Sequence, residues 1–140
     1  MAQVEALPRS RRLILDSGAI LGLARGDAVA RAALELAVRE GYVAVIPTPV
    51  LAQVHRGGHD RARIDRVVNA VGAALPTSEA IARRAGELQA KTGTADVVDA
   101  IVVAEALASV PAVILTSDPR DLGRLLEGEP EADRVRLVGV

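Results

Sequence analysis

Four aspartates stand where their carboxylates could converge on one point. Asp16 follows the short apolar run Leu13–Leu15, and Asp118 comes shortly after a second apolar run, 112–115. Asp96 and Asp99 open a third apolar segment, where a spacing of three residues places them about 60° apart around a helix axis. Acids that are distant in the sequence are therefore candidates for a single site.

Clustered carboxylates point to one kind of chemistry. Like charges repel and unpaired buried charge is costly, so such a cluster implies either raised pKa values or a bound cation. Ligands that are all oxygen select Mg²⁺ or Mn²⁺. An ion held in this way binds phosphate oxygens, activates a water and neutralises the charge that develops during phosphodiester cleavage.

Each aspartate taken alone also has a structural interpretation. Asp16 precedes Ser17 and Gly18 as a helix cap would, and Asp96 with Asp99 resembles a capping box. Asp118 before Pro119 is a common turn opening. Caps occur at helix starts anywhere, whereas these starts all belong to the carboxyl edge of one expected sheet. Their shared location favours a functional site.

Weaker candidates surround these acids. The hydroxyls of Ser17 and Thr116 could hold a metal-bound water or a phosphate, although a local turn or cap explains both equally well. The segment 55–66 carries four arginines and two aspartates, a net charge of +2. Such a segment is often a solvated face, but if RNA binds, the candidate phosphate contacts are Arg56, Arg61 and Arg120.

Composition narrows the class of protein further. The 140 residues suit one domain, and 50% hydrophobic with 25% charged residues excludes a disordered chain. The absence of cysteine excludes disulfides, thiolate zinc sites and a cysteine nucleophile. Tyr42 is the sole aromatic residue and the net charge is −1, so neither stacked bases nor a bulk basic field can dominate nucleic-acid binding.

The start of the chain indicates where the protein works. Residues 1–11 are a polar lead-in that is unlike a signal peptide, and no apolar stretch is long enough to span a membrane. We expect a soluble, cytoplasmic protein without a membrane partner.

Alternating patterns predict an α/β domain with a mainly parallel sheet and helices on both faces. Short apolar runs predict strands at 13–15, 42–46, 72–75, 112–115 and 134–138, the last of them half exposed at an edge. Helical periodicity predicts helices at 27–40, 50–56, 61–71, 78–91 and 97–108, and a short one through 122–126. Thr48 is the expected cap of the second of these helices, and Val29, Ala32, Ala33, Leu36 and Ala37 are the expected inward face of the first. In such a sheet the crevice lies beyond the carboxyl ends of the strands, where the aspartates stand.

Four strings of the sequence resemble a PIN domain, as in the VapC-type toxins of toxin-antitoxin pairs. They are LILDSGAILGL, TPVLAQVHRGG, DVVDAIVVAEAL and ILTSDPRDL, which occur in the family's order and spacing from Leu13 to about Leu126. The resemblance implies an α/β/α sandwich in a single domain, 1–140, and a Mg²⁺- or Mn²⁺-dependent endoribonuclease activity on RNA. It also implies a homodimer and a small antitoxin as partner.

The resemblance assigns roles by position. Asp16, Asp99 and Asp118 match the family's catalytic, metal-binding acids, and Asp96 is an added acid of the kind commonly found near the second of them. Gln53 departs from the pattern, because PIN nucleases usually carry Glu there. An amide keeps a carbonyl oxygen for a cation, but it removes one negative charge and cannot act as a base.

Two function classes stay open. The first is a metal-dependent RNA endonuclease, the toxin of a type II pair. The second is a PIN-like binding or scaffolding module with weak or no catalysis, for which Gln53 is the main argument. A receiver domain is excluded, because it needs an acidic pair at the first strand, where Asp16 stands alone.

Overall fold

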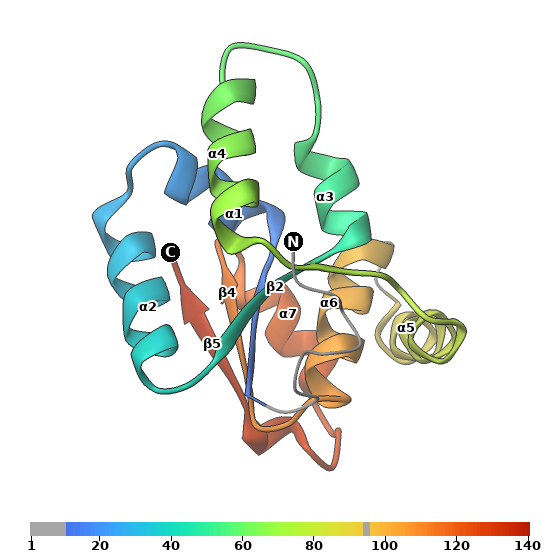
Figure 1. Cartoon of the computed structure of the whole chain (residues 1–140). Coiled ribbons are helices and arrows are strands. Elements are labelled where there is room, and N and C mark those ends of the chain that lie inside the picture. Colours follow the sequence, from blue (N-terminus) through green and yellow to red (C-terminus); the bar gives the residue numbers. More distant parts are fainter. Residues whose placement is uncertain (1–10, 94–95) are drawn as a thin grey trace.

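A five-stranded sheet forms the centre of the computed structural model, which describes residues 11–93 and 96–140 (Figure 1). The strand order is β3-β2-β1-β4-β5, and every neighbouring pair is parallel. The strands are β1 (Arg12–Leu15), β2 (Val43–Pro47), β3 (Ala74–Leu75), β4 (Ala112–Thr116) and β5 (Val135–Gly139). The predicted α/β class is confirmed, while the lead-in before Arg11 lies outside the described residues.

The two central strands owe their position to uninterrupted apolar runs. Leu13–Leu15 of β1 and residues 112–115 of β4 are buried on both sides, as expected for strands covered by helices on both faces of a parallel sheet. Strand β5 lies at the edge of the sheet and is partly exposed, as predicted, although its burial does not alternate strictly.

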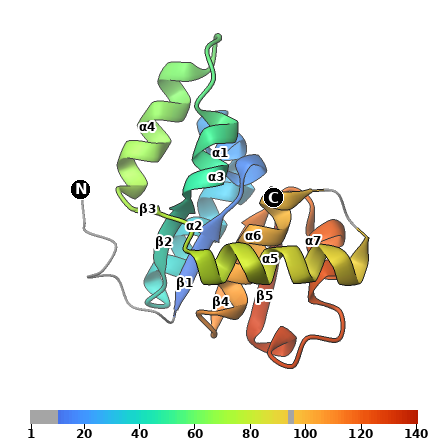
Figure 2. The same ribbon diagram turned by 90° about the vertical axis from the view of Figure 1, so that its right-hand side faces the viewer.

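Helices cover both faces of the sheet. Their bounds are α1 (Ser17–Ala24), α2 (Ala28–Arg39), α3 (Thr48–Val54), α4 (Arg61–Val71), α5 (Glu79–Thr92), α6 (Val97–Leu107) and α7 (Pro119–Leu126), with a 3-10 turn, η2 (Ala132–Arg134). Helices α1 and α2 lie on one face and α6 and α7 on the other (Figure 1), and α5 crosses the outside of α6 and α7 (Figure 2). None of the described helices is long and apolar enough to cross a membrane.

Helices α3 and α4 project beyond the carboxyl edge of the sheet and are joined by the loop 55–60 (Figure 1). Helix α3 begins at Thr48 with Pro47 as its N-cap and has no side-chain cap bond. The prediction of a Thr48 cap was therefore wrong. Pro49 favours a helix start at this point, because its fixed φ suits the first helical turn and its missing N–H would have no helical partner there.

Periodicity did not predict α1, although the cap interpretation of Asp16 implied that a helix starts there. Its residues SGAILGLA are almost all apolar, so they show no helical period that could separate a helix from a loop. The inward face predicted for α2 was right only in part: Ala37 is buried and Ala33 packs against the core, but Val29 is 60% and Leu36 53% exposed. The helix buries Ala30 together with Ala37, because these small side chains let its backbone approach the sheet closely.

Helix α6 is buried on nearly all sides from Ala100 to Ala106, because it lies between the sheet and helices α5 and α7. One charged residue is enclosed there: Glu105 is only 4% exposed, and burial raises its pKa to about 7 against the attraction of Arg12. A buried carboxyl with this pKa destabilises the folded chain once it ionises.

We therefore expect Glu105→Gln to stabilise the protein at alkaline pH. The pKa of Glu105 is about 7 in the folded chain and near the ordinary 4.5 in the unfolded chain. The folded state binds more protons between these values, so the free energy of unfolding falls as pH rises through them. The variant should gain about 2 kcal/mol above pH 8 and nothing below pH 4.5 in urea unfolding. Glu127→Gln, at an exposed site, is the control. A variant that is less stable at alkaline pH would show that ionised Glu105 is held favourably by Arg12.

Candidate active site

The register of the two central strands brings the first candidate residues together. Leu15 pairs with Leu115, so Asp16 and Thr116 emerge side by side at the carboxyl edge. The Asp16 amide donates to the Leu115 carbonyl at 3.2 Å, and the Thr116 hydroxyl donates to Oδ2 of Asp16. Residues one hundred positions apart in sequence are thus joined directly.

Asp16 is both the end of β1 and the N-cap of α1. Its Oδ1 accepts from the Ala19 amide at 2.9 Å, and the residue is 7% exposed. Burial raises the pKa of Asp16 above its ordinary value, while hydrogen bonds from Thr116, Ala19 and Gly18 oppose that rise. The cap interpretation of Asp16 is confirmed, and the second oxygen faces the turn after β4.

Thr116 links the two acids of this edge. Its hydroxyl donates to Asp16 and accepts from the Asp118 amide at 2.9 Å. Asp118 is the N-cap of α7, where its Oδ1 accepts from the Asp121 amide at 3.4 Å. Thr116 is fully buried, and its hydroxyl joins the carboxylate of Asp16 to the backbone amide of Asp118.

Gly18 lets α1 approach the turn after β4 closely. A Cβ built at Gly18 would lie 2.6 Å from the Cβ of Ser117, a distance that real Cβ atoms do not reach. Any larger residue would push the start of α1 away from this turn and separate Asp16 from Asp118. Sequence reasoning missed this role.

The start of α6 supplies the other two acids. Asp96 caps the helix by accepting from the Asp99 amide at 3.0 Å, as the structural interpretation predicted. Asp99 is half-buried, and its pKa is raised to about 6, first by burial and then by the charges of Asp96, Asp16, Asp118 and Asp121. The other three predicted acids are thus each close enough to act on Asp99. Asp121, in the first turn of α7, is a fifth acid that sequence reasoning did not single out.

The donor set suits a hard divalent cation. Every candidate ligand is a carboxylate or amide oxygen, and the mutual repulsion felt by Asp99 is what a cation would relieve. Across residues 11–93 and 96–140, no group of three or more acidic or histidine side chains is arranged so that it could hold a metal ion as it stands. Three of the four carboxylates, those of Asp16, Asp96 and Asp118, point one oxygen at a helix start instead. A bound ion would therefore share these carboxylates with the helix starts and, at Asp16, with the Thr116 hydroxyl.

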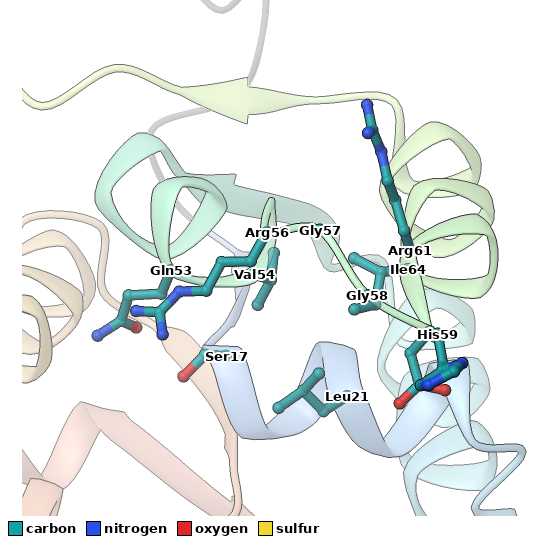
Figure 3. Close-up of a pocket in the computed structure, with 11 residues that line it drawn as sticks. Ser17, Leu21, Gln53, Val54, Arg56, Gly57, Gly58, His59, Arg61 and Ile64 are labelled. Carbon is teal, nitrogen blue, oxygen red and sulfur yellow. The ribbon is translucent and has the colours of Figure 1, made fainter.

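A cleft of about 410 Å³ begins beside the acids, between α1 and the projecting helices α3 and α4 (Figure 3). Ser17 and Gln53 line one end of it together with Arg56. The predicted supporting residues Ser17 and Gln53 therefore line the same end of the cleft. Ser17 follows Asp16 directly in the chain.

The three candidate arginines are placed differently. Arg56 lies at the end of the cleft that holds Ser17 and Gln53, whereas Arg61 extends away from them (Figure 3). Arg61 also lies 3.8 Å from the Asp65 carboxylate. Arg120 is exposed in the first turn of α7, two residues after Asp118.

Comparison with known proteins identifies the family. The sequence profile of the PIN domain matches residues 13–127, so the chain belongs to the PIN domain family. No curated protein sequence matches it. PIN domains are generally nucleases, which supports a hydrolase activity for this chain.

Two solved structures share the fold. One is a toxin-antitoxin complex from Klebsiella pneumoniae, with a TM-score of 0.64 and 21% identity, covering 88% of this chain and 94% of that one. The other is VapBC2 from Rickettsia felis bound to a DNA fragment from their promoter, with a TM-score of 0.69 and 15% identity over 91% of this chain and 98% of that one. The predicted α/β/α fold is confirmed by this likeness.

Proposed function

We propose that this chain is a Mg²⁺- or Mn²⁺-dependent endoribonuclease and the toxin component of a type II toxin-antitoxin pair. The observation that carries the proposal is the gathering of Asp16, Asp99 and Asp118 at one sheet edge, with the pKa of Asp99 raised first by burial and then by the charges of the other acids. These three are the proposed catalytic metal ligands, and Asp96 assists them.

Each residue has a physical task in this proposal. A bound Mg²⁺ or Mn²⁺ supplies charge neutralisation for the phosphate and activates water. Thr116 fixes Asp16 and Asp118 relative to each other through its two hydrogen bonds. Gln53 and Ser17 present an amide and a hydroxyl to the same space from the adjoining cleft. Arg56, Arg61 and Arg120 are the proposed contacts to RNA phosphates.

The proposed partners follow from the similar structures. One of them is a toxin-antitoxin complex and the other is VapBC2 bound to promoter DNA, which supports a small antitoxin as the partner of this chain. We also propose that the chain forms a homodimer. Its proposed location is the cytoplasm, where its RNA substrate is found.

Gln53 favours a second candidate function, a PIN-like binding or scaffold module with weak or no catalysis. The chain lacks a carboxylate at this position of the cleft, and so has one negative charge fewer for holding a cation. Asp96 offsets that loss, since it brings an added acid to the cluster around Asp99. The first function is therefore better supported.

Cleavage of RNA with and without metal separates the two functions. We expect purified protein to cut single-stranded RNA in Mn²⁺ or Mg²⁺ and to stop when EDTA removes the ion, because the carboxylates alone cannot neutralise the phosphate. A panel of labelled RNAs resolved on denaturing gels measures this. Cleavage that persists in EDTA contradicts the metal-dependent mechanism. An uncut panel at high protein and Mn²⁺ concentrations favours the binding module.

A further inference from the structure

The cleft between α1, α3 and α4 differs in charge from the acidic site beside it. Gln53, Arg56 and the glycine pair Gly57-Gly58 line it next to Ser17, with His59, Asp60 and Arg61 further along. A neutral amide, a guanidinium and exposed backbone therefore adjoin a cluster of carboxylates. The cleft is therefore better suited than the acidic site to bind an anionic group of a ligand.

Arg56 is the cation that this cleft offers. Its exposed side chain turns back along α3, so that the guanidinium lies between Gln53 and Ser17 in the close-up (Figure 3). Nowhere in the described part of the chain does a carboxylate lie within ion-pair distance of Arg56, whereas Arg61 and His55 both face Asp65, at 3.8 Å and 3.6 Å. The Arg56 charge is thus available to a ligand.

Gln53 keeps that charge available. It lies in the last turn of α3, which ends at Val54, and Arg56 follows in the loop after the C-cap His55. The close-up shows the Arg56 side chain reaching back from this loop, so that its guanidinium lies beside the Gln53 amide (Figure 3). A glutamate here would pair with Arg56 and repel an incoming phosphate. The amide leaves the guanidinium uncompensated, and its N–H group adds a second donor.

The loop after α3 gives a polynucleotide room to approach. Gly58 has φ +132°, a conformation that L side chains rarely adopt, and a Cβ at Gly57 or Gly58 would meet nothing within 4 Å. The backbone of this loop is therefore bare at the cleft, next to Arg56.

We propose that this cleft is a phosphate subsite for the RNA strand, in which Arg56 binds a backbone phosphate flanking the scissile bond. In this view Gln53 is the residue that keeps Arg56 free for substrate, rather than a weakened metal ligand. The inference rests on the proposed ribonuclease function. It specifies that glutamine at position 53 favours binding of the RNA phosphate, whereas glutamate would favour binding of the metal ion.

Binding in EDTA tests the subsite without turnover. We expect Arg56→Gln to weaken binding of a short fluorescein-labelled single-stranded RNA by about tenfold in fluorescence anisotropy, as for loss of one charged hydrogen bond. The slope of log affinity against log salt should become shallower by about 0.7, the value for one phosphate contact on a single strand. Arg63→Gln removes the same charge from an exposed site on α4 outside this cleft, and should change the affinity less than twofold.

The coupling between positions 53 and 56 gives the sharper result. We expect Gln53→Glu to weaken RNA binding severalfold in EDTA, because the new carboxylate pairs with Arg56 and repels phosphate. Adding Arg56→Gln to Gln53→Glu should then cost clearly less than Arg56→Gln costs alone, since contacting residues are not additive. The same Gln53→Glu variant should bind Mn²⁺ more tightly in titration calorimetry.

The outcomes separate this inference from the proposed function. If the unaltered protein cuts RNA with Mn²⁺ but Arg56→Gln binds RNA as tightly as Arg63→Gln, the subsite is wrong and the nuclease stands. Fully additive effects of the two substitutions would remove the role assigned to Gln53. If the unaltered protein neither cuts nor binds RNA, the nuclease proposal fails and the subsite with it.

Discussion

Asp16→Asn is expected to lower the rate of RNA cleavage in Mn²⁺ by at least about 100-fold, the scale of losing one charge-stabilising group at a reacting phosphate. Asp16 is 7% exposed and is fixed from two sides, by the Ala19 amide and the Thr116 hydroxyl. Asparagine keeps the size of the side chain and one carbonyl oxygen, and it is a good helix cap, so the fold should survive. The charge is what the variant loses.

Single-turnover cleavage rates and thermal melts of the same preparations measure this expectation. Asp133→Asn is the matched control, because Asp133 is exposed in η2 and is not among the residues that line the cleft. It should cut RNA at nearly the unaltered rate. An Asp16→Asn protein that folds and still cleaves within a few-fold of the unaltered rate would show that Asp16 is only the cap of α1.

Those parts of the fold that rest on strong local signals could be predicted from the sequence. Continuous apolar runs located β1 and β4, and the aspartate that follows each run marked the carboxyl edge of the sheet. Because the two strands are parallel neighbours, in-register pairing of Leu15 with Leu115 then decided that their following residues would meet. The resemblance to the PIN domain could suggest that these strands pair, but only the structure gave their register.

What could not be predicted depended on packing between elements. Helix α2 has two adjacent stripes of small and apolar residues, and periodicity cannot decide which one faces the sheet. The close approach of Gly18 to Ser117 joins segments that lie far apart in the sequence, so no local pattern shows it. The same holds for Asp121, whose charge matters only because the start of α7 lies near Asp99.

The structural interpretation of three of the acids is confirmed, and it is compatible with the role proposed for them as metal ligands. Asp16, Asp96 and Asp118 each cap a helix, and the helix starts they cap all lie near one edge of the sheet. Capping uses one oxygen of each carboxylate and holds the side chain in place. Asp99 differs, since its backbone amide donates to the capping carboxylate of Asp96. Within the described part of the chain, its own carboxylate has no interaction that lowers its pKa. Replacing Asp99 is therefore the clearest way to decide whether an acid of this cluster acts as a metal ligand or only stabilises the fold.

We expect Asp99→Asn to melt above the unaltered protein in EDTA at neutral pH. The pKa of Asp99 is about 6 in the folded chain against the ordinary 3.8, so the folded state binds more protons between these values and its stability falls as pH rises through them. The penalty is complete above pH 6 and absent below 3.8. After allowance for solvent screening it amounts to about 1 kcal/mol, or a melting temperature higher by about 2–5 °C in the variant. This gain should vanish in melts recorded near pH 3.8.

Mn²⁺ should reverse the order of the two proteins. A ligand stabilises only the state that binds it, so the unaltered protein should gain stability with Mn²⁺ while Asp99→Asn loses most of that gain, together with RNA cleavage. Asp133→Asn, at an exposed position of η2 away from the acids, should follow the unaltered protein in both conditions. Loss of a helix cap would act in the opposite direction, lowering the melting temperature in EDTA by the equivalent of about 1 kcal/mol. If Asp99→Asn melts lower in EDTA and still gains the full Mn²⁺ shift, Asp99 serves the start of α6 and the metal must be held without it.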